Sequence, residues 1–111
     1  MRLRQGINQI YETRARILKA IAHPTRLFIL DKLKNKEYCV CELTKLVGAD
    51  VSTVSKHLSI MKNAGILTTR KEKNIVYYDI TCDCVTRYIE CIDEVIRNTA
   101  VNHRKLLKTI K

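Results

Sequence analysis

Five cysteines are the residues whose type and spacing point to chemistry in this 111-residue chain, because four of them form two Cys-x-Cys pairs. The pairs are Cys39 with Cys41 and Cys82 with Cys84, and Cys91 stands apart. An odd cysteine count, in a chain whose start lacks the apolar run of a secretory signal, argues against a disulfide framework and for a cytoplasmic protein. The thiols are therefore expected to bind a metal or to sense oxidation.

The spacing of the first pair predicts its local structure. Residues two apart point in nearly opposite directions on a helix, but to the same side of an extended chain. To share a ligand, Cys39 should lie in an extended segment, residues 37–40, and Cys41 in the first turn of the helix that follows. A helix N-terminus stabilises a thiolate, and thiolates prefer soft ions, here As(III), Sb(III), Cd, Pb or Zn, to hard ones. No organic cofactor is expected.

The other three cysteines lie in the C-terminal helix that the sequence predicts. Cys91 follows Cys84 by two turns on the same stripe, so in an antiparallel pair of helices it approaches Cys84 of the partner subunit. One interpretation is a trigonal thiolate site formed by Cys82, Cys84 and Cys91 of the partner subunit. The other is that Cys91 is a small core residue, which is a common role of free cysteine.

Two helices are predicted in residues 5–35. Apolar residues recur at three- and four-residue steps as far as Ala22; His23-Pro24 then interrupts the helix, and Pro24 suits the first position of a second one. The apolar positions of the first helix are Ile7, Ile10, Tyr11, Leu18 and Ile21. Those expected to face inward in the second are Leu27, Phe28 and Leu30.

A helix-turn-helix is predicted in residues 42–64. Gly48 suits the left-handed position that ends its first helix, and Asp50 suits the N-cap of its second. The expected inward positions are Leu43, Leu46, Val47, Val51, Val54, Leu58 and Met61. The polar side chains left outside on the second helix include Ser52, Thr53, Ser55, Lys56, Ser59 and Lys62. The first four lie toward the end that a helix-turn-helix inserts into the major groove, so we expect them to contact base edges.

His57 lies on the same helix and has two interpretations. It could reach a phosphate or a base, and on that ground it belongs with the expected DNA contacts. It could instead be a half-buried histidine that packs beside Leu58.

A β-hairpin is predicted in residues 66–80 and a helix in residues 82–108. The hairpin has two segments rich in β-branched and aromatic residues around a polar tip. Arg70, Lys71 and Lys73 at that tip are expected to contact phosphates or the minor groove. The C-terminal helix carries two adjoining apolar stripes, more than a small monomer needs, which favours a dimer interface over ordinary core packing.

Length and composition place these elements in one small domain, residues 1–111. Lys and Arg number 21 against 11 Asp and Glu, and the formal net charge of +10 favours nucleic acid before an anionic membrane as a partner. No run of about 18 apolar residues is present, so no membrane span is expected. Most of the excess charge lies in residues 1–36, whereas residues 37–69 are neutral. The charge therefore supplies general attraction to DNA, and specificity is assigned to the helix-turn-helix.

The order of the elements and four short segments resemble the ArsR/SmtB family of metal-sensing winged helix-turn-helix repressors. The segments are Ala20 to Leu27 (AIAHPTRL), Cys39 to Leu43 (CVCEL), Ser52 to Leu58 (STVSKHL) and Ala64 to Leu67 (AGIL). This resemblance covers almost the whole chain. It implies a mainly α fold with a β-hairpin wing and a homodimer formed through the N- and C-terminal helices. It also implies binding to double-stranded operator DNA, with release when a metal or metalloid binds.

The sequence departs from the family's ligand sets in three places. Arsenic-sensing members can carry a further cysteine where Thr44 stands, and cadmium- or lead-sensing members use N-terminal cysteines, of which residues 1–38 have none. Zinc-sensing members pair two half-sites on the last helix. The first becomes Cys82-Asp83-Cys84, which can bind an ion, but the second becomes Val95 and Asn98, which cannot. A third ligand must therefore come from elsewhere, or the ion must accept an external thiol.

These observations predict a DNA-binding repressor, not an enzyme, released by a thiophilic ion bound to cysteine thiolates. The nearest alternative keeps the fold and makes disulfide formation, within or across the cysteine pairs, the signal. A thiol oxidoreductase is more remote, because the chain lacks a Cys-x-x-Cys near a βαβ pattern. An RNA-binding domain is disfavoured, because Tyr77 and Tyr78 alone do not form a stacking platform.

Overall fold

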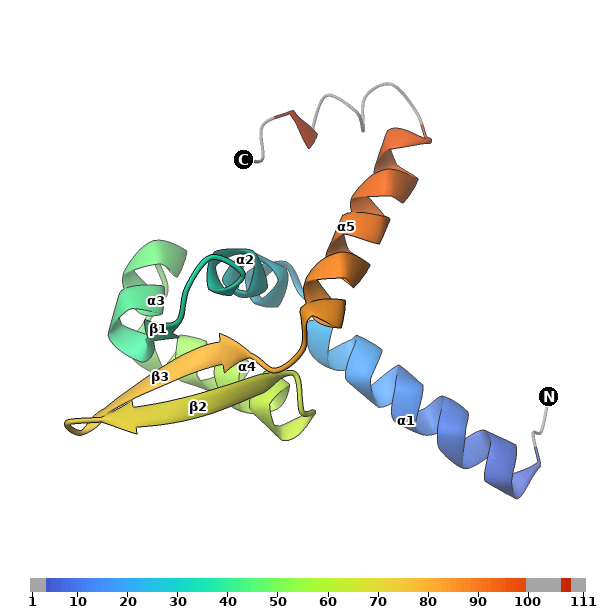
Figure 1. Ribbon diagram of the computed structural model, residues 1–111, viewed down its shortest axis with the longest axis horizontal. Coiled ribbons are helices and arrows are strands. Elements are labelled where there is room, and N and C mark those ends of the chain that lie inside the picture. The colour runs from blue at the N-terminus through green and yellow to red at the C-terminus, as the bar shows by residue number, and fades with distance from the viewer. Residues whose placement is uncertain (1–3, 100–106, 109–111) are drawn as a thin grey trace. The chain divides into compact units, whose positions relative to one another are not determined.

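The computed structural model describes residues 4–99 and 107–108, which form five helices and three strands (Figure 1). In chain order they are α1 (Gln5–Ile21), α2 (Pro24–Leu33), β1 (Tyr38–Cys39), α3 (Val40–Val47), α4 (Val51–Asn63), β2 (Leu67–Glu72), β3 (Ile75–Ile80) and α5 (Asp83–Arg97). The chain divides into two units. The first, Met1–Thr81, holds α1 to α4 and the sheet, and the second, Cys82–Lys111, holds α5.

The helix ends of the first unit follow from local side-chain chemistry. His23 is the N-cap of α2, where its Nδ1 accepts a 3.0 Å hydrogen bond from the Thr25 N–H. Gly48 adopts a left-handed φ of 79° after α3, and Asp50 Oδ1 caps α4 by accepting a 2.7 Å bond from the Thr53 N–H. The predicted breaks between α1 and α2 and between α3 and α4 are confirmed.

The core of this unit lies where α2, α3, α4 and the sheet meet. Its fully buried side chains are Ile29, Leu30, Leu33, Leu43, Val54, Leu58 and Met61. Three expected inward positions are wrong, because Phe28, Leu46 and Val51 are exposed by 38%, 44% and 54%. Val51 opens α4 before its packed turns begin, and α3 is so short that Leu43 alone fills the core from it. On α2, the side chain buried in the core is that of Ile29, the neighbour of Phe28.

The predicted hairpin is present, with a tighter turn than expected. β2 and β3 pair from Leu67 opposite Ile80 to Glu72 opposite Ile75, so only Lys73-Asn74 joins them. Both turn residues have positive φ, 50° and 68°, the conformation that matches the twist of a two-residue hairpin. The strands therefore continue through a segment that the sequence assigns to the tip.

The hairpin is part of a three-stranded antiparallel sheet in the order β1-β3-β2. β1 pairs with β3, with Tyr38 opposite Tyr78 and Cys39 opposite Tyr77. The sequence predicts the extended conformation of Cys39 but not its pairing with β3. This pairing joins the segment before α3 to the hairpin, and the three strands together are called the wing below.

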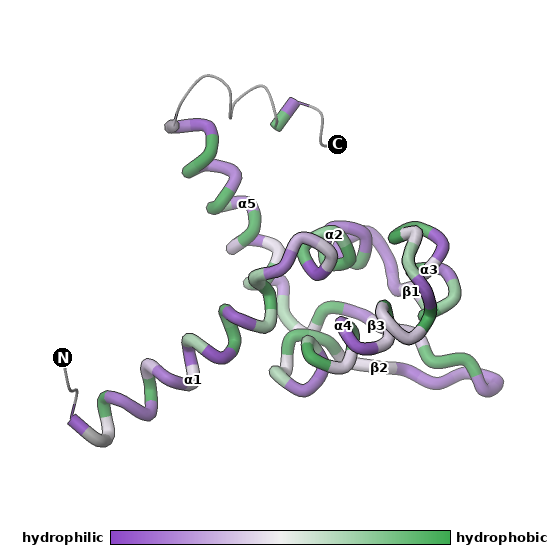
Figure 2. Tube along the Cα trace, turned by 180° about the vertical axis from the view of Figure 1, so that it is seen from behind, coloured by the Kyte–Doolittle hydropathy of each residue, from purple (hydrophilic) through white to green (hydrophobic). Residues whose placement is uncertain are grey.

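α1 buries only its last turn, where Ala20 and Ile21 lie in the core. Apolar residues nevertheless recur along the whole helix (Figure 2). The exposed ones are Ile7, Ile10, Tyr11, Ile17 and Leu18. The apolar stripe that the sequence predicts for this helix is therefore largely uncovered in a single chain.

α5 has no buried residue, although apolar side chains recur along it as well (Figure 2). Its exposed apolar residues include Tyr88, Ile92 and Val95. The predicted helix over residues 82–108 is too long, because α5 ends at Arg97, and residues 100–106 lie outside the described part of the chain. No helix among the described residues is long and apolar enough to cross a membrane.

Leu58→Ala should lower the free energy of unfolding by about 2 to 5 kcal/mol, because it leaves a cavity at a fully buried position. Val51→Ala removes apolar atoms from an exposed position on the same helix and should cost less than about 0.5 kcal/mol. Urea denaturation at one chain concentration measures both changes. Equal losses in the two variants would contradict the core described above.

Candidate nucleic-acid interface and thiol sites

The outer face of α4 presents short polar side chains and a lysine around an open hollow. The hollow is lined by Asp50, Val51, Ser52, Ser55, Lys56 and Ser59. Thr53 is exposed at the same end of the helix. The structure therefore brings together three of the four predicted base-contacting residues and leaves the fourth accessible.

This face has the chemistry that a DNA groove requires. Serine and threonine hydroxyls both donate and accept hydrogen bonds, and short side chains let a helix backbone come close to base edges. Val54, Leu58 and Met61 on the opposite side are fully buried. The helix is thus held by one face and available on the other.

The surroundings of His57 are those of the second interpretation, a half-buried histidine that packs inside the protein. It is half-buried, and its ring centroid lies 4.5 Å from that of His23. Its Nδ1 accepts a 3.1 Å hydrogen bond from Arg26 Nε. Burial, followed by the charges of His23, Arg26 and Lys56, lowers the pKa of His57. Nδ1 of His57 is therefore used inside the protein, as the second interpretation expects, and a contact of His57 with DNA stays a prediction.

Arg70 also lies elsewhere than predicted, in the middle of β2 opposite Tyr77 and not at the tip. Its guanidinium carbon is 4.8 Å from the centroid of the Tyr77 ring, and the group pairs with Glu37 and Glu72. The hydrogen bonds that Arg70 donates to Glu37 and Glu72 raise the pKa of Arg70 further above its usual range, and the bond to Glu37 lowers the pKa of that carboxyl. Arg70 therefore fastens the segment before β1 to the wing, and its charge is already paired.

The exposed cations near the wing tip are Lys71 and Lys73. Lys73 is the first residue of the two-residue turn, and Lys71 is the residue opposite Val76 in the adjoining strands. They keep the role that the sequence predicts for the hairpin tip, that of cations available to phosphates. Sequence reasoning missed Glu37, which lies 33 positions from Arg70 and gives no local signal of the pairing.

Cys39 and Cys41 lie as the extended lead-in predicts. Cys39 is the N-cap of α3 with φ −90° and ψ 168°, and Cys41 lies in the first turn. The backbone N–H of Cys39 donates a 3.0 Å hydrogen bond to Glu42 Oε1. This bond is the main cause of the lowered pKa of Glu42.

Cys82 and Cys84 repeat the same arrangement at the start of α5. Cys82 is the N-cap, and its Sγ accepts a hydrogen bond from the Cys84 N–H at 3.3 Å. The Cys84 side chain, which also hydrogen-bonds Cys82, is the main cause of a lowered pKa at Cys82, and the same interaction raises the pKa of Cys84. The pair therefore combines a thiol that ionises easily with one that does not. Cys91 is exposed further along the helix.

Neither pair gains a third protein ligand from the residues that the structure describes. No group of three or more His, Cys, Asp or Glu side chains within those residues could hold a metal ion. Each pair thus offers two sulfur ligands, which fit a thiophilic ion only if a further ligand comes from another molecule. All five cysteines are free thiols.

The chain is similar to transcription regulators by three measures. Residues 23–69 match the family model described as "Bacterial regulatory protein, arsR family". An uncharacterized HTH-type transcriptional regulator of Methanocaldococcus jannaschii is 42% identical over 86 residues, which cover 77% of this chain and 97% of that protein. The crystal structure of NolR from Sinorhizobium fredii superposes with a TM-score of 0.78 at 32% identity, covering 86% of this chain and 95% of that one.

A second similar structure is that of a homodimer. It is the solution structure of a homodimeric winged helix-turn-helix DNA-binding domain from Mycobacterium bovis. Its TM-score is 0.75 at 29% identity, with 84% of this chain and 86% of that chain covered.

Iodoacetamide at neutral pH should alkylate Cys82 before Cys84, because a larger fraction of Cys82 is thiolate. Cys84→Ala should slow the alkylation of Cys82, since it removes the side chain that lowers the Cys82 pKa. Cys91→Ala, an exposed change on the same helix, is the control and should leave the rate at Cys82 unchanged. Peptide mass spectrometry after short exposures measures each site. Equal rates at Cys82 and Cys84 would show that the hydrogen-bonded pair is wrong.

Proposed function

The chain belongs to the ArsR family of bacterial regulatory proteins, and on that basis we propose that it is a homodimeric repressor of operator DNA whose inducer is a thiophilic metal or metalloid ion. The observation that carries the DNA-binding part is the exposed polar face of α4. Ser52, Ser55 and Lys56 surround one open hollow there, and the opposite face of the helix is fully buried. Its membership also makes the chain a transcription regulator and not an enzyme, so the thiol oxidoreductase is set aside.

The homodimer is supported by the uncovered apolar surface of two helices. α1 exposes five large apolar side chains, and α5 buries none of its residues in a single chain. Exposed apolar surface of this extent marks an interface, and the similar structure from Mycobacterium bovis is homodimeric. A two-fold dimer presents two copies of α4 to two half-sites about one helical turn of DNA apart.

The inducer site is assigned to the cysteine thiolates. Cys82 is the thiol whose pKa is lowered by its neighbour, so it is prepared to bind a soft ion together with Cys84. Cys39 and Cys41 form the second candidate pair, in the segment that resembles the family's thiolate site. The third ligand would be Cys91 of the partner subunit or a small-molecule thiol.

Oxidation of a cysteine pair is the second candidate signal. The Cys82–Cys84 pair favours this signal, because a disulfide needs two sulfurs and no third ligand. The Cys82 thiolate would attack a peroxide oxygen to give a sulfenic acid and hydroxide, and the Cys84 thiol would then displace water to close the disulfide.

Lys73→Gln should weaken binding to all DNA sequences by a similar factor, because a phosphate contact carries no sequence information. It should also reduce the dependence of log affinity on log salt by about one, the amount expected when the protein neutralises one phosphate fewer. Lys34→Gln removes the same charge from a lysine that pairs with Asp31 at 3.1 Å, and it serves as the control. Fluorescence anisotropy at several salt concentrations measures both. An unchanged salt dependence in Lys73→Gln would exclude the wing tip from the interface.

Arsenite or Cd(II), added to reduced protein, should weaken operator binding by about 5- to 150-fold, the range of a coupling energy of about 1 to 3 kcal/mol. Replacing both cysteines of the sensing pair with serine should abolish the response, and the same change in the other pair should preserve it. Binding without the ion should be equal in both variants. If no soft ion weakens binding while hydrogen peroxide does, the inducer is oxidation and not a metal.

A further inference from the structure

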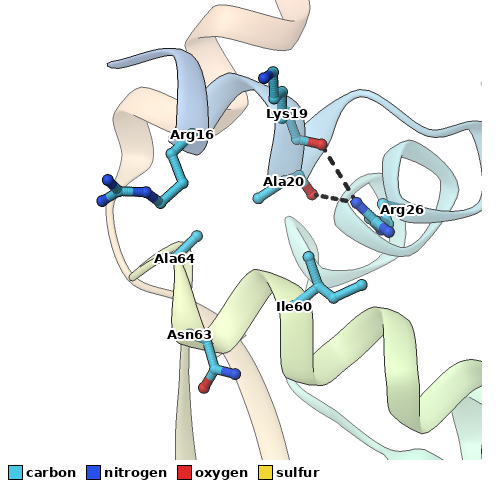
Figure 3. A pocket seen from close by; sticks show the side chains of 7 residues that line it. All are labelled: Arg16, Lys19, Ala20, Arg26, Ile60, Asn63 and Ala64. Atoms are coloured by element: carbon cyan, nitrogen blue, oxygen red, sulfur yellow. Dashed lines mark hydrogen bonds between the residues drawn. The ribbon is translucent and has the colours of Figure 1, made fainter. Parts of the chain in front are cut away.

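Arg26 lies at a junction of three helices, beside a cavity of about 420 Å³. The cavity is lined by Arg16, Lys19, Ala20, Arg26, Ile60, Asn63 and Ala64, from α1, α2, α4 and the residue after α4 (Figure 3). Nη1 of Arg26 donates to the carbonyl oxygens of Lys19 and Ala20 at 3.3 Å and 3.5 Å. These carbonyls belong to the last turn of α1, where a helix leaves acceptors without intrahelical partners and favours a cation.

The same guanidinium also bonds to α4. Its Nε donates to Nδ1 of His57 at 3.1 Å, and the His57 ring rests against His23, the N-cap of α2, at 4.5 Å. Arg26 is itself a residue of α2. One side chain therefore links the end of α1 and the start of α2 to the middle of α4.

The link depends on the protonation state of His57. A nitrogen that accepts a hydrogen bond must carry a lone pair, so Nδ1 can accept from Arg26 only while it is unprotonated. A proton on Nδ1 would replace the acceptor with a second donor facing the guanidinium.

The surrounding charges oppose that proton. The groups that act on His57 are His23 at the N-cap of α2, Arg26 of α2 and Lys56 of α4. From α1, the cations of Arg16 and Lys19 line the adjoining cavity. No carboxylate is among these groups within the part of the chain that the structure describes. Burial, followed by the charges of His23, Arg26 and Lys56, lowers the pKa of His57.

We propose that Arg26 is a positioning residue that holds the recognition helix α4 against the end of α1, and that acidification, by protonating His57, breaks this link and releases DNA. The release of DNA rests on the proposed function; the link itself does not. Its signal is the proton, which is separate from the thiophilic ion proposed as the inducer.

The expected sign follows from the direction of the pKa shift. The folded chain favours neutral His57, so the stabilising contribution is complete above the ordinary histidine pKa, about 6.5, and is lost as the pH falls through the lower folded value. A histidine that contacts DNA phosphate would give the opposite sign, because protonation would then tighten binding. The pH dependence of binding therefore separates the two roles of His57.

The decisive variant is His57→Asn, which keeps an oxygen acceptor near the position of Nδ1 and cannot be protonated in this range. We expect wild-type affinity for an operator duplex, selected from random DNA by this protein, to fall by more than about twofold as the pH is lowered from about 7.5 to about 5, below the ordinary histidine pKa of about 6.5. In His57→Asn the change should be less than about twofold. His103→Asn, the same substitution at another histidine, is the control and should keep the wild-type pH profile.

A titration without DNA tests the link independently of the proposed function. Nuclear magnetic resonance of the histidine rings should show His57 titrating below the ordinary pKa, and Arg26→Gln should raise its pKa, because it removes both the cation and the bond. This arm also decides the question if His57→Asn fails to fold. A His57 that titrates at or above the ordinary value, or that does not respond to Arg26→Gln, would overturn the link. Equal acid sensitivity in wild type and His57→Asn, or tighter binding in acid, would overturn its control of DNA binding. A chain that passes the titration and binds no duplex at any pH would instead refute the proposed function.

Discussion

The burial of one face of α4 is the constraint on which the rest of the structure depends. Val54, Leu58 and Met61 are fully buried at steps of four and three residues, and this stripe fixes both the position and the rotation of the helix. A rotation that moved the stripe outward would place serine hydroxyls in an apolar core without partners. Gly48 ends α3, the Asp50 cap sets where α4 begins, and the Arg26 side chain links α4 to the end of α1.

Features that depend on neighbours in sequence could be predicted, and features that depend on packing could not. The His23-Pro24 break, the left-handed Gly48 and the extended backbone at Cys39 each follow from a few adjacent residues. The Arg26–His57 and Arg70–Glu37 contacts join residues 31 and 33 positions apart, so their partners are decided by how the elements assemble. Phe28 and Ile29 show the same limit within one helix: both are apolar, and the surface that α2 packs against selects which one is buried.

The two cysteine pairs share one local design with different surroundings. In each, the first cysteine is an N-cap in extended conformation and the second lies in the first helical turn, so both pairs lie at a helix end that favours negative charge. At Cys39 the nearby acceptor is the Glu42 carboxylate. At Cys82 the second cysteine of the pair is itself the donor. The spacing along the sequence is identical, and the chemistry differs because of the residues that complete each cap.

Cys39 belongs to two structures at once, the N-cap of α3 and the ladder with Tyr77 of β3. The backbone that carries this thiol is therefore hydrogen-bonded to the central strand of the wing, and the Arg70–Glu37 pair fastens the same edge. A displacement of that backbone must either break the ladder or tilt the strand. Because β3 adjoins both Cys39 and the Lys73-Asn74 turn, movement of the thiol-bearing backbone is mechanically coupled to movement of the turn.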